Sequence, residues 1–277
     1  MAPDDHPEAG HSSAGTPLLS WSVVIPVKVL AVAKSRLAGL TSAARSELAL
    51  AMAADTIAAA VAAAAVGAVL VVTDDPAVTD IAAGLGALVL PDRPAAGLNE
   101  ALEYGAAHSE TIWPERGRAG LAGDLPAARP EELTAALAAA AGLGAAFVPD
   151  ADGTGTVLYA TAPGVEFRPQ FGVGSRNRHR AAGAIEIGPL EVSTAGLRLR
   201  ETGNAGNGAR EAGPDNGDTA RTPVALAGLR RDVDTVDDLR RAAELGVGER
   251  TRALLAAEAR ILGSSAVVRP ETSDDSE

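Results

Sequence analysis

The chain has 277 residues and a net charge of −12; 47% of its residues are hydrophobic and only 3% are aromatic. This length and apolar fraction suit a globular protein of one large domain or two small ones. The acidic balance argues against a nucleic-acid-binding protein, and the absence of cysteine excludes disulfide scaffolds, thiolate nucleophiles and cysteine-bound metals. Alanine accounts for 61 residues, whereas lysine occurs only twice, as Lys28 and Lys34.

Both ends of the chain are acidic and lack hydrophobic periodicity. Residues 1–20 and 263–277 are therefore predicted to be disordered tails around a single domain over residues 21–262. The first residues lack the features of a signal peptide, and the longest uncharged apolar run, Ile57–Val72, has 16 residues, fewer than the roughly 20 that a bilayer requires. We expect a cytoplasmic protein without membrane or nucleic-acid partners. The sequence leaves its oligomeric state open, a homodimer included.

Strand patterns alternate with helix patterns along the chain. The β-branched run Trp21–Val27 is typical of a strand buried on both faces, and the Ala-rich segment Thr41–Val66 predicts a long helix. This alternation predicts an α/β fold with a mostly parallel sheet covered by helices on both faces. Residues 202–222 are rich in Gly and Asn and are expected to form a flexible insertion. Further strands are expected at 69–73, 87–90, 119–122, 145–148, 156–161, 184–187 and 229–233, and further helices at 76–84, 98–108, 130–141, 236–245 and 249–261.

Three basic residues follow the first predicted strand. They are Lys28, Lys34 and Arg36, and the first two are the only lysines of the chain. Ligands of open α/β sheets bind at the carboxyl ends of the strands, where this loop must lie. The three cations therefore favour a polyphosphate site, although a solvated basic loop is the alternative. The loop is not a Walker A element, because it lacks the upstream glycines.

Carboxylates are the second candidate feature. Asp124 follows the predicted strand 119–122, and Asp232 and Asp234 close the predicted strand 229–233. An i, i+2 spacing places both side chains on one side of an extended segment. Mg²⁺ prefers one or two carboxylates together with substrate phosphate oxygens, so these residues are candidate metal ligands. Because Asp234 could instead cap the following helix, Asp232 is the stronger candidate.

Two segments combine glycines with hydroxyl groups. One is Gly153–Thr156, and the other is Phe171–Arg176, which leads into a short helix bearing Arg178 and His179. A helix that begins with Gly-Ser offers main-chain N–H groups to an anion. Plain turns are the alternative interpretation of both segments.

Several catalytic patterns are missing from the sequence. It contains no GxSxG, no HExxH and only four histidines, so neither a serine hydrolase nor a zinc enzyme is supported. No GxGxxG pattern opens a helix after the first strand, which argues against an ordinary dinucleotide dehydrogenase.

Taken together, these segments resemble the phosphoenolpyruvate/2-phospho-L-lactate guanylyltransferases of deazaflavin coenzyme F-420 biosynthesis. The chain departs from the family pattern in a longer insertion around residues 190–222 and at Arg176, where a small residue often follows the matched serine. The matching segments run in family order over about residues 21–250 and are VVIPVKVLAVAKSRLA (23–38), LNEALEYGA (98–106), GDLPAARPEEL (123–133), DGTGT (152–156), FGVGSRNRH (171–179), GAIEI (183–187) and RRDVDTVDDLRRAAELGVG (230–248).

The resemblance implies a Rossmann-like nucleotidyltransferase fold, a three-layer sandwich similar to that of the glycosyltransferase-A enzymes. It also implies that Thr156, Gly172 and Ser175 hold a three-carbon phospho-acid, and that Asp124 and Asp232 hold Mg²⁺ as the catalytic residues. In the implied reaction, a phosphate oxygen of phosphoenolpyruvate or 2-phospho-L-lactate attacks the α-phosphorus of GTP, and pyrophosphate leaves. The attacking phosphate is already anionic, so no general base is required.

Two other functions stay open at this point. One is a different nucleotidyltransferase of the same fold that acts on a sugar phosphate or on a molybdenum cofactor; the lack of a Gly-rich stretch directly after the first strand disfavours it. The other is a non-catalytic nucleotide-binding module, which would not need carboxylates at two strand ends. The sequence does not decide which phospho-acid is the acceptor.

Overall fold

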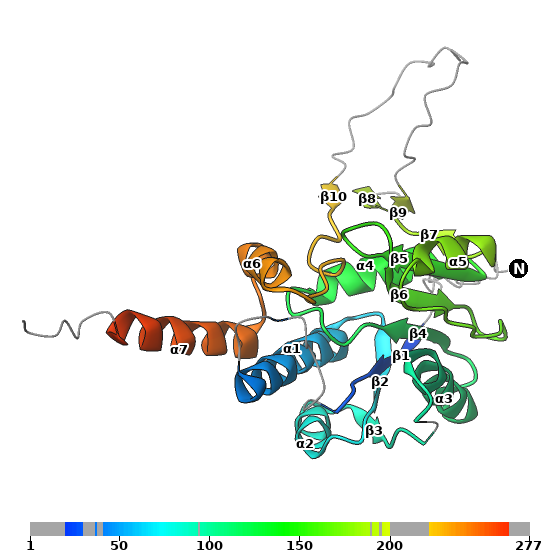
Figure 1. Ribbon diagram of the computed structural model, residues 1–277. Coiled ribbons are helices and arrows are strands. Elements are labelled where there is room, and N and C mark those ends of the chain that lie inside the picture. The colour runs from blue at the N-terminus through cyan, green and yellow to red at the C-terminus, as the bar shows by residue number, and fades with distance from the viewer. Residues whose placement is uncertain are drawn as a thin grey trace, which may run out of the picture.

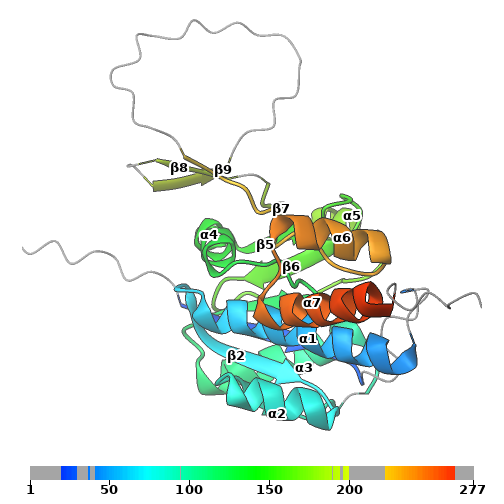
Figure 2. The ribbon, with the colours of Figure 1, turned by 90° about the vertical axis from the view of Figure 1, so that its left-hand side faces the viewer.

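The computed structural model describes residues 20–29, 37, 41–93, 95–188, 190–193, 196–199 and 222–265. Its main element is a sheet with helices on both faces (Figures 1 and 2). The strands of this sheet are β1 (Trp21–Pro26), β2 (Val66–Val72), β3 (Leu88–Leu90), β4 (Gly117–Leu121), β5 (Ala145–Pro149), β6 (Thr156–Thr161) and β7 (Ile185–Glu186). The helices are α1 (Ser42–Ala62), α2 (Pro76–Gly84), α3 (Leu98–Ile112), α4 (Pro130–Ala140), α5 (Ser175–Ala181), α6 (Val236–Leu245) and α7 (Glu249–Ser265).

The seven strands are ordered β3-β2-β1-β4-β6-β5-β7. All neighbouring strands are parallel except at β6, which runs antiparallel to β4 and to β5. The short loop between β5 and β6 can join only antiparallel neighbours, because a parallel connection needs a long crossover. The predicted mostly parallel α/β sheet is therefore confirmed.

Side chains alternate between the two faces of the sheet. On β1, Val23 and Ile25 pack with apolar residues of α1, α2 and α4, whereas Val24 points to the opposite face and packs with residues of α3. Close helix packing depends on small residues: a Cβ atom added at Gly105 of α3 would overlap the Val24 side chain. A third cluster, which includes Met52 and Leu239, joins α1 to α6. The result is the three-layer sandwich expected from the sequence.

Some predicted boundaries differ from the structure. The first helix ends at Ala62, and β2 starts earlier than expected, at Val66. A second sheet was not predicted; it is antiparallel with the order β10-β8-β9 and includes Thr222, the last residue of the predicted flexible insertion. Its strands are β8 (Leu190–Ser193), β9 (Gly196–Leu199) and β10 (Thr222–Val224).

Other predictions fall outside the described residues. These are the tail over residues 1–19, the residues of the C-terminal tail beyond Ser265, and residues 200–221 of the insertion. Helix α7 extends to Ser265, slightly past the predicted end of the domain at residue 262. Among the helices that the structure describes, none combines the length and the hydropathy required to cross a membrane.

Candidate functional site

A cavity of about 430 Å³ opens at the carboxyl ends of β1 and β2. Its lining includes Lys28 and Val29 from the segment after β1, Asp74 from the segment after β2, and Leu98 at the start of α3. The volume lies within the range of small-molecule sites. Lys28 thus lies where the sequence predicts a ligand. The two other predicted cations, Lys34 and Arg36, lie outside the described residues.

The two carboxylates with the strongest sequence support lie in neighbouring segments. The main-chain N–H of Val233 donates a hydrogen bond to the carbonyl oxygen of Asp124 (3.2 Å), which joins the segment after β4 to the segment before α6. Burial raises the pKa of the Asp232 carboxyl to about 7, and the negative charges of Asp124 and Asp150 add to this effect. The fold therefore concentrates negative charge at this point, as a cation site requires.

The segment that carries Asp232 is not the predicted strand. Residues 227–230 form a turn, and the main-chain N–H groups of Gly228 and Leu229 donate to the buried carboxylate of Glu132 (3.1 and 2.8 Å). Gly228 is required here, because a Cβ atom would overlap the carbonyl oxygen of Ala127. The prediction of a strand over 229–233 is wrong, because these contacts with α4 hold the main chain in a turn.

Asp234 is more exposed than Asp232. Its side chain is exposed, and the segment that holds Asp232 and Asp234 is not extended as a strand. Within the described part of the chain, no three His, Cys, Asp or Glu side chains are grouped so that they could hold a metal ion. Asp124 and Asp232 are therefore the better-placed pair, and a role of Asp234 as a third ligand stays a prediction.

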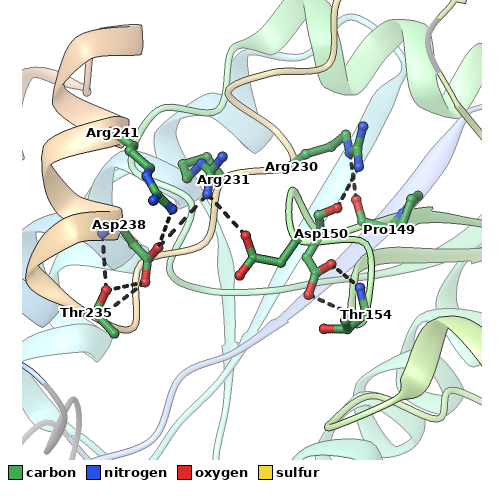
Figure 3. A network of polar contacts seen from close by, with 10 residues as sticks. Pro149, Asp150, Thr154, Arg230, Arg231, Thr235, Asp238 and Arg241 are labelled. Carbon is green, nitrogen blue, oxygen red and sulfur yellow. Dashed lines mark hydrogen bonds and ion pairs between the residues drawn. The ribbon is translucent and has the colours of Figure 1, made fainter.

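Thr235, rather than Asp234, caps helix α6. Its hydroxyl accepts a hydrogen bond from the main-chain N–H of Asp238 (3.2 Å), and the Asp238 carboxylate accepts one from the main-chain N–H of Thr235 (3.0 Å). This reciprocal pair is a capping box (Figure 3). The alternative role that the sequence suggests for Asp234, a helix cap, thus belongs to its neighbour.

Asp150 is an acidic neighbour of Asp232 that the sequence analysis does not single out. It follows β5, and its carboxylate accepts hydrogen bonds from the main-chain N–H groups of Thr154 (2.8 Å) and Gly155 (2.7 Å). Its charge is also one of those that raise the pKa of Asp232. The only sequence signal is an acidic residue before the glycine-rich loop, a pattern that is also common in plain turns.

Two arginines tie this loop to the segment before α6 (Figure 3). Arg230 donates to the carbonyl oxygens of Pro149 (3.0 Å) and Asp150 (2.7 Å). The guanidinium of Arg231 lies within ion-pair distance of Asp152 (3.7 Å) and Asp238 (4.0 Å). These contacts bring the loop after β5 and the segment of Asp232 together, so the charge of Asp150 acts on Asp232.

The two segments that combine glycines with hydroxyl groups, 153–156 and 171–176, are in contact. Thr156 begins β6 and Ser175 begins α5, and both side chains are buried. The main-chain N–H of Arg176 donates to the carbonyl oxygen of Thr154 (3.3 Å), which joins the two segments directly. The Thr156 Oγ1 atom lies 3.0 Å from Nδ1 of His179, while Ser175 Oγ is buried without a hydrogen-bond partner among the described residues. The fold thus brings two of the three predicted substrate residues into one region.

Gly172, the third predicted substrate residue, lies in the exposed loop before α5. Its φ of +111° is a conformation that side-chain-bearing residues rarely adopt. The adjacent Phe171 exchanges two hydrogen bonds with the Asn99 side chain (2.7 and 3.3 Å), and Arg178 donates to the carbonyl oxygens of Gln170 and Phe171 (2.9 and 3.2 Å). The loop that carries Gly172 is therefore held from both α3 and α5.

Arg176, where the family pattern often has a small residue, has a structural role. Its guanidinium donates two hydrogen bonds to Glu186 on β7 (2.9 and 2.8 Å) and one to the carbonyl oxygen of Gly153 (2.9 Å). The larger side chain therefore links α5 to β7 and to the glycine-rich loop.

Comparisons with known proteins agree on one family. A family model described as guanylyl transferase CofC-like matches residues 21–180. A phosphoenolpyruvate guanylyltransferase of Thermomonospora curvata is 48% identical over 238 residues, which cover 86% of this chain and 90% of that protein. A protein of the same name from Geodermatophilus obscurus is 46% identical over 250 residues, which cover 88% of this chain and 98% of that protein.

Solved structures show more distant similarity. A nucleotidyl transferase from Methanothermobacter thermautotroptrophicus matches 82% of this chain and 97% of its own, with a TM-score of 0.48 and 16% identity. A putative nucleotide-diphospho-sugar transferase from Desulfovibrio desulfuricans matches 61% of this chain and 80% of its own, with a TM-score of 0.49 and 15% identity.

Proposed function

The chain belongs to the guanylyl transferase CofC-like family, and from this membership we propose that it transfers the guanylyl group of GTP to phosphoenolpyruvate. A phosphate oxygen of the acceptor forms a bond to the α-phosphorus of GTP, the bond between the α-phosphorus and the bridging oxygen breaks, and pyrophosphate leaves. The observation that carries the proposal is the 48% identity to a phosphoenolpyruvate guanylyltransferase over 86% of this chain. The enzyme is a nucleotidyltransferase and acts in deazaflavin coenzyme F-420 biosynthesis.

The two substrates are assigned to two regions of the site. The cavity beside Lys28 takes GTP, and its position at the carboxyl ends of β1 and β2 supports this assignment. Lys34 and Arg36, which lie outside the described residues, are expected to bind the triphosphate as well. Thr156 and Ser175, together with the Gly172 loop, take the phospho-acid, because their hydroxyl groups can donate hydrogen bonds to its anionic oxygens.

Asp124 and Asp232 fit a divalent cation. Partial burial raises the pKa of the Asp232 carboxyl, its acidic neighbours add to this effect, and a bound cation would offset both. When bound, Mg²⁺ would neutralise phosphate charge and increase the electrophilicity of the α-phosphorus. The cation would be held by these two carboxylates and by substrate oxygens.

The chain itself supplies binding, orientation and charge. The acceptor phosphate is anionic near neutral pH, so no residue needs to remove a proton from it. His179, the histidine that lies nearest to the hydroxyl groups in sequence, has both ring nitrogens engaged in hydrogen bonds and is fully buried. It is therefore unsuited to proton transfer, in agreement with a reaction that depends on positioning and charge neutralisation.

Product analysis tests the proposal. The purified chain is incubated with Mg²⁺, one nucleoside triphosphate and one acceptor: phosphoenolpyruvate, 2-phospho-L-lactate or a sugar 1-phosphate. We expect pyrophosphate and a guanylylated product, identified by its mass, with GTP and phosphoenolpyruvate. A product formed only with the sugar phosphate would indicate the alternative transferase. Binding of GTP without pyrophosphate release from any acceptor would indicate a nucleotide-binding module.

A further inference from the structure

His179 lies in an aromatic environment next to the hydroxyl group of Thr156. Its side chain is completely buried, its ring stacks on Tyr159 (4.7 Å between centroids), and Phe147 and Phe171 lie at 5.5 and 5.9 Å. Burial lowers the pKa of His179 to about 4, and the charge of Arg178 adds to this effect. The imidazole is therefore neutral near pH 7 and carries one ring hydrogen.

The surrounding main chain determines which nitrogen carries that hydrogen. The main-chain N–H of Gln170 lies 2.9 Å from Nε2 of His179, and a main-chain N–H can only donate. Nε2 is therefore the acceptor, and the ring hydrogen lies on Nδ1. Because Nδ1 is 3.0 Å from Oγ1 of Thr156, it donates to the hydroxyl oxygen of that residue.

This arrangement determines whether the Thr156 hydroxyl donates or accepts a hydrogen bond toward a ligand. Its oxygen accepts from His179, so its own hydrogen is available for a different acceptor. With the opposite tautomer, Nδ1 would accept that hydrogen, and Thr156 would present only lone pairs to a bound anion. Each hydrogen bond of such a chain also strengthens the next one by polarisation.

We infer that His179 is a positioning residue that makes the Thr156 hydroxyl an obligate hydrogen-bond donor to an anionic oxygen of the phospho-acid. The inference rests on the proposed function, because that function supplies the ligand. Ser175 gives independent support: its hydroxyl is fully buried without a partner in the described part of the chain, and it lies four residues before His179 in α5, on the same helix face. A buried hydroxyl without a hydrogen-bond partner destabilises the folded protein, and a bound ligand that supplies the partner removes this cost.

A matched pair of substitutions separates the two hydrogen bonds of the ring. In His179→Asn, the side-chain amide nitrogen can occupy the place of Nδ1 and donate to Thr156. In His179→Gln, the amide oxygen can occupy the place of Nε2 and accept from Gln170, while the donor to Thr156 is lost. We expect His179→Gln to raise KM for phosphoenolpyruvate roughly 10-fold with KM for GTP within about 2-fold, and His179→Asn to retain most of the affinity.

A double-mutant cycle tests whether His179 acts through Thr156. Thr156→Val should raise KM for phosphoenolpyruvate, and adding His179→Gln should raise it no further. His108→Gln, on α3, is the matched control and should leave both KM values unchanged. The thermal midpoint of every variant is measured alongside. An equal rise in KM for both His179 variants, or additive effects of His179→Gln and Thr156→Val in an active enzyme, would overturn the inference.

The tautomer can be measured without turnover. Nitrogen-15 NMR of protein with labelled histidine, with the His179 signal assigned by its absence in His179→Asn, should show the hydrogen on Nδ1. A hydrogen on Nε2 would overturn the inference while leaving the proposed function intact. If instead the unsubstituted enzyme forms no product from GTP and phosphoenolpyruvate, the proposed function fails, and the ligand assigned here fails with it.

Discussion

The main-chain N–H of Val233 donates a hydrogen bond to the carbonyl oxygen of Asp124, at 3.2 Å. This contact joins two segments that are far apart in the chain. Burial raises the pKa of the Asp232 carboxyl, and repulsion by the charge of Asp124 adds to this effect. The energetic cost of that repulsion is useful only if a cation offsets it, so the pair should matter for activity more than for folding.

Removal of either carboxylate should abolish turnover. Asp124→Asn and Asp232→Asn are each expected to lower kcat at least ~100-fold, because a ligand of the metal that stabilises the transition state contributes several kcal/mol. Steady-state kinetics at saturating GTP, phosphoenolpyruvate and Mg²⁺ measure this effect. Asp237→Asn is the control, because that exposed residue on α6 forms an ion pair with Arg240. A near-normal kcat for either site variant would show that the metal assignment is wrong.

Mg²⁺ should stabilise the protein through the same two residues. Addition of Mg²⁺ to metal-free protein is expected to raise the thermal midpoint of the unsubstituted chain, because a ligand that binds only the folded state stabilises it. The midpoint of Asp232→Asn should respond much less. Its midpoint without metal should exceed that of the unsubstituted protein, because one of the repelling carboxylates is gone. Equal responses of both proteins to Mg²⁺ would place the ion elsewhere.

Lys28 and Ser175 should affect different substrates. Lys28→Ala removes a charge-assisted phosphate contact worth ~1.5–3 kcal/mol and should lower kcat/KM for GTP roughly 10- to 100-fold. Ser175→Ala should mainly raise KM for phosphoenolpyruvate. Arg240→Ala, a substitution on the exposed face of α6, serves as the control. The opposite pattern, with Lys28→Ala weakening only the phospho-acid, would mean that the two substrate regions are exchanged.

Glu132 should be needed for both stability and activity. Its buried carboxylate accepts the main-chain N–H groups of Gly228, Leu229 and Arg129, so Glu132→Ala leaves buried donors without partners. We expect a loss of about 2–4 kcal/mol in the free energy of unfolding, measured with urea, and a lower kcat because the turn before Asp232 loosens. Glu132→Gln keeps one acceptor oxygen and should lose less. Equal stability of all three proteins would show that the turn does not depend on this carboxylate.

The stability of the protein should depend on pH through His179. Its pKa is lowered from 6.5 to about 4 in the folded state, so between these pH values the unfolded chain binds a proton that the folded chain excludes. The free energy of unfolding therefore falls as the pH decreases through this range, by up to about 3 kcal/mol. Urea unfolding at pH 7.5 and pH 4.5 measures the change, which should be smaller in His179→Asn. An unchanged pH dependence in that variant would contradict a neutral buried imidazole.

Local sequence determined much of the sheet. The β-branched run of β1 and the apolar run of β6 predict buried strands because such residues pack on a pleated surface, and Pro76 and Pro130 mark helix starts because proline is favoured in the first helical turn. The positions of Lys28 and Asp124 after strands also followed from sequence, since a loop after a strand of a parallel sheet must lie at its carboxyl end.

Tertiary contacts decided the rest of the site. The turn before Asp232 exists because Glu132 of α4 binds the main chain of Gly228 and Leu229, and no local pattern around residue 229 reports a partner so distant in the chain. The same holds for Asp150, whose charge matters only where the fold places it near Asp232, and for His179, whose tautomer depends on the main chain of Gln170. Residue types along the chain thus determined the strands and the available chemical groups. Hydrogen bonds between remote segments determined which of those groups meet and in which protonation state, because burial and neighbouring charge exist only in the folded protein.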